Sequence, residues 1–335
     1  MTERALIDAA IAGDEGAYAK VIDPFRIGLR GYCYRMLGSV QDAEDATQEA
    51  LFRAWRGLAS FQHRSSLRSW LYAIAANVCL RMLERRPPRV LPIEYGPPGD
   101  PHQPLAEAHD DSTWIEPYRE DRLGLHSEPA GPEAGYAQSE TVELAFIAAL
   151  QHLPARQRAV LILREVLGFS AAEVATALDT SPASVYSALQ RAHASVDRRV
   201  PEPSQLATLR SLGDERLREI ADAYVQAWED HDVDRIVSML TETATVGMPP
   251  TPTWYRGREA IAAFLESRPL SGDLIWRLTP ASANGQLAAD AQLWDPDTHS
   301  FRPHHTAVLT LDGELIDQVT TFLRPWALTV ARRPG

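Results

Sequence analysis

Lysine, cysteine and long apolar runs are scarce in this sequence. Lys20 is the only lysine, so nearly all of the positive charge is arginine. The two cysteines, Cys33 and Cys79, form no CxxC pair and lack a histidine cluster, which argues against a zinc site or a disulfide framework. No run reaches the roughly 20 apolar residues of a membrane span, and residues 1–20 form an acidic amphipathic segment, not an export signal. We therefore expect a cytoplasmic protein with two reduced, half-buried thiols and with no metal or cofactor.

A basic surplus is also absent, because the net charge is −12 at pH 7. Proteins that bind DNA unaided usually carry such a surplus, since the neutralisation of phosphates supplies most of their affinity. A protein that reaches DNA while mounted on a larger basic partner does not need one. The charge balance therefore restricts a nucleic-acid function to a protein that acts together with such a partner.

The length and the periodicity of the chain predict several domains. The 335 residues, 45% of them hydrophobic, are enough for roughly two or three folded domains. Helical periodicity covers residues 1–90 and 141–200, whereas residues 214–330 begin with helices and end in β-type alternation. The predicted fold class is multidomain, with two all-α domains followed by an α+β cone. Residues 87–140 hold 11 acidic residues and three arginines, a local net charge of −8 with histidine neutral. We interpret residues 91–140 as an acidic, Pro-rich linker that cannot fold alone.

The predicted helix over residues 41–58 has two unlike faces. A narrow apolar stripe follows helical spacing and consists of Ala43, Ala46, Ala50, Ala54 and Leu58. The opposite face carries Asp42, Asp45, Glu49 and Phe52. Such a charged face is usually just solvated, but Phe52 among carboxylates favours a docking surface for a basic partner.

A second predicted helix begins after a cap at Ser65 or Ser66 and has a basic flank. Its apolar side is predicted to bury Leu67, Leu71, Ile74, Val78 and Met82. Trp70, Asn77 and Arg81 follow one another along the flank. An aromatic ring, an amide and a guanidinium can hold an unstacked single strand by stacking, edge hydrogen bonds and phosphate contacts. The alternative is that Trp70 belongs to the core.

Asp42 to Trp55 (DAEDATQEALFRAW) and Phe61 to Arg86 (FQHRSSLRSWLYAIAANVCLRMLERR) closely resemble region 2 of extracytoplasmic-function (ECF) RNA polymerase sigma factors. The resemblance implies that the first helix contacts the β′ clamp of core RNA polymerase through Asp42, Asp45, Gln48, Glu49 and Phe52. It also implies that the second helix melts the minus-ten promoter element and captures a flipped base. The implied DNA contacts are Trp70, Asn77 and Arg81, with a base pocket shaped by residues 61–64, including Phe61 and Arg64.

Residues 141–200 end in a predicted helix-turn-helix. Ser170 with Glu173 has the spacing of a capping box, and Ser181 before Pro182 gives an N-cap with proline at the first helical position. The last helix is predicted to bury Val185, Leu189, Ala192 and Val196, with Tyr186 and Ala188 on or near its exposed side. This stretch is similar to sigma region 4, which reads the minus-thirty-five element. The expected readers are Ser184, Ser187, Gln190 and Arg191.

The resemblance also implies a path for the acidic linker, which in sigma factors threads through the basic active cleft and RNA exit path of the polymerase, between its β and β′ subunits. Residues 114–118 (WIEPY) form an apolar island in this linker. It is either an anchor or a chance cluster, and the sequence does not decide between them.

The C-terminal residues look like a SnoaL-like domain of the nuclear-transport-factor-two-like fold, notably at WYRGREAIAAFL (Trp254–Leu265). Such cones enclose a pocket, for which the expected lining residues are Trp228, Met248, Trp276, Trp294 and Phe322. Related enzymes use Asp or His as acid–base groups, so the candidates here are His231, Asp232, His304, His305 and Asp317. No matched acid–base pair can be assigned from sequence, and fold does not carry function. We expect a regulatory, ligand-sensing domain and no enzyme.

Three functions compete. The leading hypothesis is a promoter-specificity subunit with an appended control domain and a candidate small-molecule ligand. The second is an ordinary helix-turn-helix regulator, against which the region 2 resemblance counts strongly. The third is a pocket enzyme fused to a transcription module, which would need a charged pair converging inside the cone.

Overall fold

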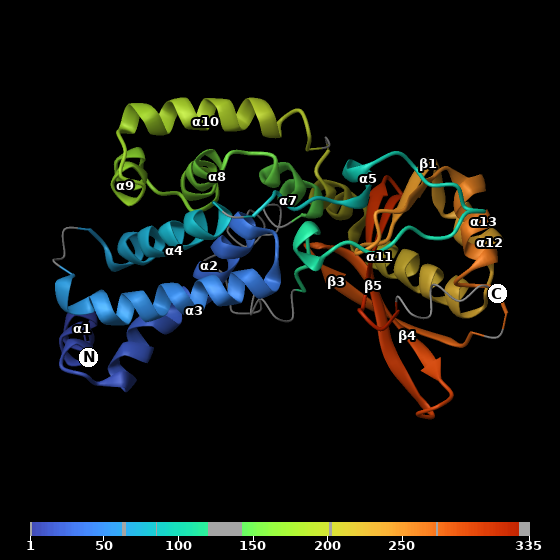
Figure 1. Cartoon of the computed structure of the whole chain (residues 1–335), viewed down its shortest axis with the longest axis horizontal. Coiled ribbons are helices and arrows are strands. Elements are labelled where there is room, and N and C mark those ends of the chain that lie inside the picture. Colours follow the sequence, from blue (N-terminus) through green and yellow to red (C-terminus); the bar gives the residue numbers. More distant parts are fainter. Residues whose placement is uncertain are drawn as a thin grey trace. The chain divides into compact units, whose positions relative to one another are not determined.

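The computed structural model describes residues 2–61, 65–84, 86–119, 143–200, 203–272 and 274–327. The described residues form two compact units, visible in Figure 1. The first unit combines the N-terminal part of the chain up to Arg89 with Ala145–Val200. The second begins at Val90 and adds residues 143 and 144 and the C-terminal part of the chain. The linker residues 90–119 therefore pack with the C-terminal domain and not as a separate segment.

The N-terminal half of the first unit is helical, with α1 (Glu3–Ile11), α2 (Glu15–Leu37), α3 (Val40–Gly57), a 3-10 turn (Leu58–Ser60) and α4 (Leu67–Leu83). The side chain of Ser39 caps α3 and that of Ser66 caps α4. The predicted alanine stripe of α3 is confirmed, since every member is at most 2% exposed. In α4, Leu67, Leu71 and Val78 are buried as predicted, whereas Ile74 and Met82 are only half-buried.

The two cysteines lie in α2 and α4, and both are free and fully buried, not half-buried as expected. Burial, together with a contact from Cys33, raises the pKa of the Cys79 thiol. A thiol in that state is a poor nucleophile, so both side chains behave as small apolar groups.

The other half of the first unit contains α7 (Leu144–Gln151), α8 (Ala155–Leu161), a π turn (Ile162–Val166), α9 (Ala171–Ala177) and α10 (Pro182–Val196). The capping box is confirmed: Glu173 N donates to Ser170 Oγ at 3.2 Å, and Ser170 N donates to Glu173 Oε2 at 2.8 Å. Ser181 caps α10 and Pro182 is its first residue. The predicted apolar side is slightly rotated, because Ala188 is buried and Leu189 only half-buried.

These two halves pack on each other through α4, α8 and α9. Arg68 on α4 donates from Nη2 to the carbonyl of Leu167 at 2.7 Å, and its guanidinium lies 4.2 Å from the centroid of the Phe169 ring. The neighbouring Ser69 hydroxyl donates to Glu173 at 2.8 Å. The region 2-like helices and the helix-turn-helix are thus held together as one body.

Arg158 of α8 makes a second connection between the halves. It is buried and donates to the carbonyl of Met36 at the end of α2 and to the side chain of Gln151. Burial lowers the pKa of Arg158 to about 10, which still leaves the guanidinium charged at neutral pH. A buried cation at the carboxyl end of a helix is well placed, because the last carbonyls of a helix lack intrahelical partners.

The second unit is built on a six-stranded sheet with the order β2-β1-β6-β5-β4-β3. Its helices are α11 (Gln205–Glu229), α12 (Val233–Ser238) and α13 (Arg258–Ser267), and its strands are β1 (Leu240–Gly247), β2 (Trp254–Arg256), β3 (Trp276–Ala283), β4 (Gln286–Asp295), β5 (Ser300–Asp312) and β6 (Leu315–Leu323). As Figure 1 shows, the helices cover one face of the curved sheet. The buried residues between them form the core of the α+β cone.

Two details of this unit differ from the sequence expectation. Strands β1 and β2 come between α12 and α13, whereas the sequence predicted β-type alternation only after the helices. β1 pairs in parallel with β6, with Val246 opposite Val319, so its partner lies far along the chain and leaves no local turn signal. α11 begins at Gln205, upstream of residue 214, and bends at Gly213, whose φ of 77° suits glycine. A turn at Asp312-Gly313 joins β5 to β6.

The described part of the linker runs along this cone. It contains α5 (Pro92–Tyr95) and a 3-10 turn (Asp111–Thr113). Gly99 N donates to the carbonyl of Trp254 at 2.7 Å, and His109 N donates to the carbonyl of Pro250 at 2.9 Å. The described part of the acidic stretch is held by backbone hydrogen bonds to the cone.

The apolar island in the linker is an anchor, which decides between the two interpretations of the sequence. Trp114, Ile115 and Tyr118 are at most 3% exposed. Tyr118 N donates to Asn284 Oδ1 at 2.8 Å, and Arg119 forms an ion pair with Asp290. Three buried apolar side chains and two polar contacts fix this segment on the C-terminal domain.

Candidate functional sites

The exposed face of α3 carries four of the five side chains predicted to contact polymerase. Asp45, Gln48, Glu49 and Phe52 are all exposed, and Phe52 is 55% exposed despite its apolar ring. Glu49 pairs with Arg53 at 2.6 Å, one turn further along the helix. The structure therefore gathers two carboxylates, an amide and an aromatic ring on one accessible surface.

A hollow of about 410 Å³ adjoins this face. Its walls come from α2 and α3 and consist of Glu15, Tyr18, Arg26, Gln48, Leu51, Phe52 and Trp55. Trp55 packs edge-on against Tyr18, with ring centroids 4.7 Å apart. An exposed ring beside an aromatic-walled hollow can receive an apolar side chain of a partner, with the carboxylates at the rim.

Asp42 does not share this face, so the expectation of an exposed carboxylate there is wrong. It is 7% exposed and accepts hydrogen bonds from Arg86 and Arg89. Burial alone raises the pKa of Asp42, but the two guanidinium groups outweigh this effect and hold the pKa below its usual range. The carboxylate ties the chain after α4 to the start of α3. Because its partners are distant in sequence, helical spacing alone could not reveal this role.

The flank of α4 presents the residues predicted to face single-stranded DNA. Asn77 and Arg81 are exposed, and the Asn77 amide donates to the carbonyl of Ala73 at 2.9 Å. Trp70 is half-buried, with its ring 5.1 Å from that of the buried Phe61. One side of Trp70 thus contributes to packing while the other remains accessible. Arg64, the fifth member of this predicted site, lies outside the described residues.

The exposed side of α10 carries all four residues predicted to read the minus-thirty-five element: Ser184, Ser187, Gln190 and Arg191. Tyr186 joins them and is 59% exposed. The first turns of a recognition helix are those that enter the major groove, so this side is available for base edges and phosphates.

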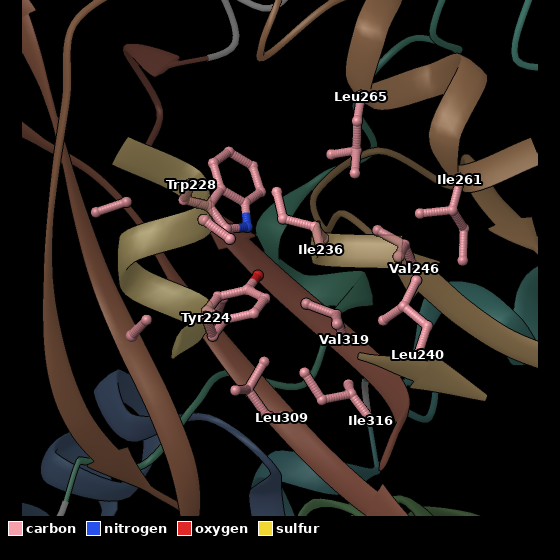
Figure 2. Packing of buried hydrophobic residues seen from close by; sticks show 14 of the residues in the cluster. Tyr224, Trp228, Ile236, Leu240, Val246, Ile261, Leu265, Leu309, Ile316 and Val319 are labelled. Atoms are coloured by element: carbon pink, nitrogen blue, oxygen red, sulfur yellow. The ribbon is translucent and has the colours of Figure 1, made fainter. Parts of the chain in front are cut away.

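The cone contains a cavity of about 380 Å³. Its walls are mostly apolar, as the cluster in Figure 2 shows, and its lining residues come from α11, α13 and the sheet. Trp228, Met248 and Trp276 line it as predicted. Trp294 and Phe322 do not. Phe322 lies between Thr321 and Leu323, which both line the cavity, so its side chain points to the opposite face of β6. Trp294 packs on Phe301, with ring centroids 5.2 Å apart.

His304 and His305 both line this cavity, although neighbours on a strand normally point to opposite faces. The register between β4 and β5 shifts here, since Ala291 is opposite His305 and Gln292 opposite Pro303. This bulge leaves His304 without a partner on β4 and brings the Nδ1 atoms of His304 and His305 to 2.9 Å from each other. Burial lowers the pKa of His304 to about 4 and that of His305 well below its usual value. Both rings are therefore neutral at pH 7.

The remaining acid–base candidates do not join the histidines. Asp232 caps α12 by accepting from Arg235 N at 2.9 Å, and Asp317 accepts from Thr241 at 2.8 Å. Neither they nor His231 are among the residues that line the cavity, and none of the described lining residues carries a carboxylate. The charged pair that an acid–base enzyme would need is thus not assembled by the described residues. They also contain no cluster of three or more His, Cys, Asp or Glu side chains fit for a metal, and no helix long and apolar enough to span a membrane.

Comparisons with known proteins agree with this arrangement. The sigma-70 region 2 family matches residues 22–87, the sigma-70 region 4 family residues 143–195 and the SnoaL-like domain family residues 221–319. The chain is 38% identical to the ECF RNA polymerase sigma factor SigG of Mycobacterium tuberculosis, over 96% of this chain and 88% of that protein. It is 27% identical to the ECF sigma-E factor of Escherichia coli, over 60% of this chain and 95% of that one.

A solved structure extends the comparison to the fold. The ECF sigma factor SigJ of Mycobacterium tuberculosis aligns with a TM-score of 0.59 and 20% identity, covering 93% of this chain and 99% of that one. At this identity the likeness shows the fold alone. Three observations lead to one conclusion. Both halves of the first unit match sigma-70 families, nearly the whole chain is similar to SigG, and α3, α4 and α10 have exposed faces. The protein belongs to the ECF RNA polymerase sigma factors, which direct RNA polymerase to promoters, and it carries a C-terminal SnoaL-like domain.

Proposed function

We propose that this sigma factor docks on the β′ clamp of core polymerase through the exposed face of α3 and melts the minus-ten element with the flank of α4. α10 then reads the minus-thirty-five element beside the β subunit. Asp42 contributes indirectly by holding Arg86 and Arg89. The work takes place in the cytoplasm, where polymerase and promoter meet. The observation that carries the docking assignment is the exposed Phe52 among carboxylates beside an aromatic hollow.

Charge reversal on α3 tests the docking step. The double variant Asp45→Arg with Glu49→Arg changes two exposed side chains and leaves the buried alanine stripe untouched. We expect it to keep wild-type helicity but to lose binding to core polymerase and transcription from a cognate promoter. The reversal Asp8→Arg on the exposed side of α1 is a control outside the hollow and should bind normally. Wild-type affinity of the double variant for core polymerase would show that α3 is not the docking helix.

We propose further that the C-terminal domain controls the sigma factor and does not catalyse a reaction. Two arrangements support this role. The linker between the two DNA-reading halves is fastened to the cone at Trp114, Ile115 and Tyr118. The halves themselves are joined by Arg68 and Arg158. A sigma factor must separate its two halves to span promoter elements that lie about 25 base pairs, some 85 Å, apart at 3.4 Å per base pair. A closed, fastened form is therefore inactive until it opens.

A point variant that frees the linker tests this control. Ile115→Ser places a hydroxyl at a fully buried anchor position without removing a domain. If the fastened linker restrains the sigma factor, the variant should transcribe more than the wild type at limiting protein concentration. The exposed linker substitution Glu107→Ser is the control and should change nothing. Equal transcription by the Ile115→Ser variant and the wild type would contradict control through the linker.

A further inference from the structure

The cavity of the cone offers hydrogen-bond donors without acceptors to match them. Trp228 is 7% exposed, and its indole N–H faces the Tyr224 hydroxyl (Figure 2), with which it interacts electrostatically, but the pair does not meet hydrogen-bond geometry. The Nε of Arg268 is likewise buried without an acceptor among the described residues. Both side chains line the cavity. A buried N–H without a partner is destabilising because it has lost its hydrogen bond to water, so a bound molecule that accepts from these groups would recover free energy.

The charges at the cavity select the kind of acceptor. Among the described lining residues, Arg268 is the only one with a formal charge, because the two histidines are neutral. Within the described part of the chain Arg268 forms no ion pair, and its Nη2 donates to the carbonyl of Gln103 at 2.8 Å. An arginine without an anionic partner at the wall of an apolar cavity suits a planar oxyanion that can accept two parallel N–H bonds.

We propose that this cavity binds an apolar molecule that carries one carboxylate, with the carboxylate on Arg268 and Trp228 and the apolar body against Trp276 and the aliphatic wall. The cavity volume of about 380 Å³ lies within the range of small-molecule sites, about 300–1,000 Å³. The described residues of the wall include an arginine and no carboxylate, which disfavours a cationic ligand. The assignment deepens the control function proposed above, because it names the ligand class of the C-terminal domain.

The same arginine connects the cavity to the linker. A carboxylate that binds a guanidinium side-on uses Nε and Nη2 together, and Nη2 is the atom that now holds the carbonyl of Gln103. Leu105, two residues further along the linker, packs on the apolar core of the cone. A bound carboxylate therefore competes with Gln103 for Arg268 and loosens the linker around residues 99–109. Ligand binding and release of the linker are coupled through this one side chain.

Calorimetric titration of the full-length protein tests the ligand class with two isosteric probes. 2-Naphthoate carries the carboxylate, and 2-naphthamide has the same planar shape without the charge. We expect 2-naphthoate to bind at least tenfold more tightly. Arg268→Gln should reduce this preference to less than about twofold, and Trp228→Phe should weaken 2-naphthoate about fivefold while keeping the aromatic volume. Arg277→Gln removes an arginine that lies over Phe301, outside the cavity, and should leave both affinities unchanged.

Several results would overturn the proposal: no binding of 2-naphthoate, equal binding of both probes, or an unchanged preference in the Arg268→Gln variant. If that variant does not fold, the comparison of the two probes and the Trp228→Phe variant still decide. Hydrogen exchange tests the coupling, because 2-naphthoate should speed exchange of the Gly99 and His109 amides, which now donate to the cone. None of these measurements involves polymerase, so failure of the ligand assignment and failure of the sigma activity remain distinguishable.

Discussion

The contact between α4 and the helix-turn-helix contributes to the free energy that favours the closed form of the sigma factor, in which the two halves of the first unit pack on each other. In Arg68→Ala, the 2.7 Å hydrogen bond to Leu167 and the stacking on Phe169 are lost together. A hydrogen bond from a charged group contributes about 1.5–3 kcal/mol, and a cation–π contact at an accessible site about 0.5–1 kcal/mol. The closed form should therefore lose about 2–4 kcal/mol. A closed form that is populated to 99% is only about 2.7 kcal/mol more stable than the open form. The variant should therefore be substantially open.

Energy transfer between dyes in the two halves measures this opening. Cysteines introduced at the exposed Ala59 and Asp197 can be labelled selectively, because the native thiols are fully buried. We expect a lower transfer efficiency in Arg68→Ala and an unchanged one in Arg26→Ala, whose side chain pairs with Asp23 and lines the hollow within the same half. If transfer in Arg68→Ala equals that of the wild type, Arg68 does not hold the halves together, and the inactive closed form loses its main support.

Three further outcomes follow from the sites and from the histidine pair. Asn77→Ala should leave duplex binding by α10 intact but reduce promoter melting, seen by permanganate footprinting; normal melting would remove this residue from the site. Arg191→Ala should weaken promoter binding and lower the salt slope by about one charge, whereas an unchanged slope would place the arginine away from phosphate. Because burial depresses the pKa of His304 from 6.5 to about 4, the unfolded state takes up the proton first. The free energy of unfolding should then fall by about 3 kcal/mol between pH 6.5 and 4. Burial lowers the pKa of His305 as well, so in urea titrations His304→Gln should weaken the pH dependence and the double variant with His305→Gln should lose most of it. A wild-type slope in the double variant would refute the assignment.

Local signals explain why the sigma-like helices could be predicted from the sequence. The caps at Ser66, Ser170 and Ser181 and the alanine stripe of α3 involve residues within a few positions of one another. Helical periodicity and capping act over three or four residues, so a single sequence carries the information. The exposed faces of α3 and α10 follow from the same periodicity, since a buried stripe determines which side faces solvent.

Contacts between residues far apart in the chain determine the features that the sequence did not predict. Asp42 lies at a position that helical spacing assigns to solvent, yet Arg86 and Arg89 bury it. The described part of the linker is held in place because Asn284 and Trp254, both distant in sequence, accept its backbone N–H groups.

The cavity shows the same division between sequence and structure. The sequence by itself determined that Trp228 and Trp276 are apolar and that two histidines are adjacent, but alternation along a strand places those histidines on opposite faces. Only a bulge, formed against β4, turns both into the cavity. Strand register, bulges and buried ion pairs depend on which distant residues meet. That choice minimises the free energy of the whole fold, and no local window of sequence contains it.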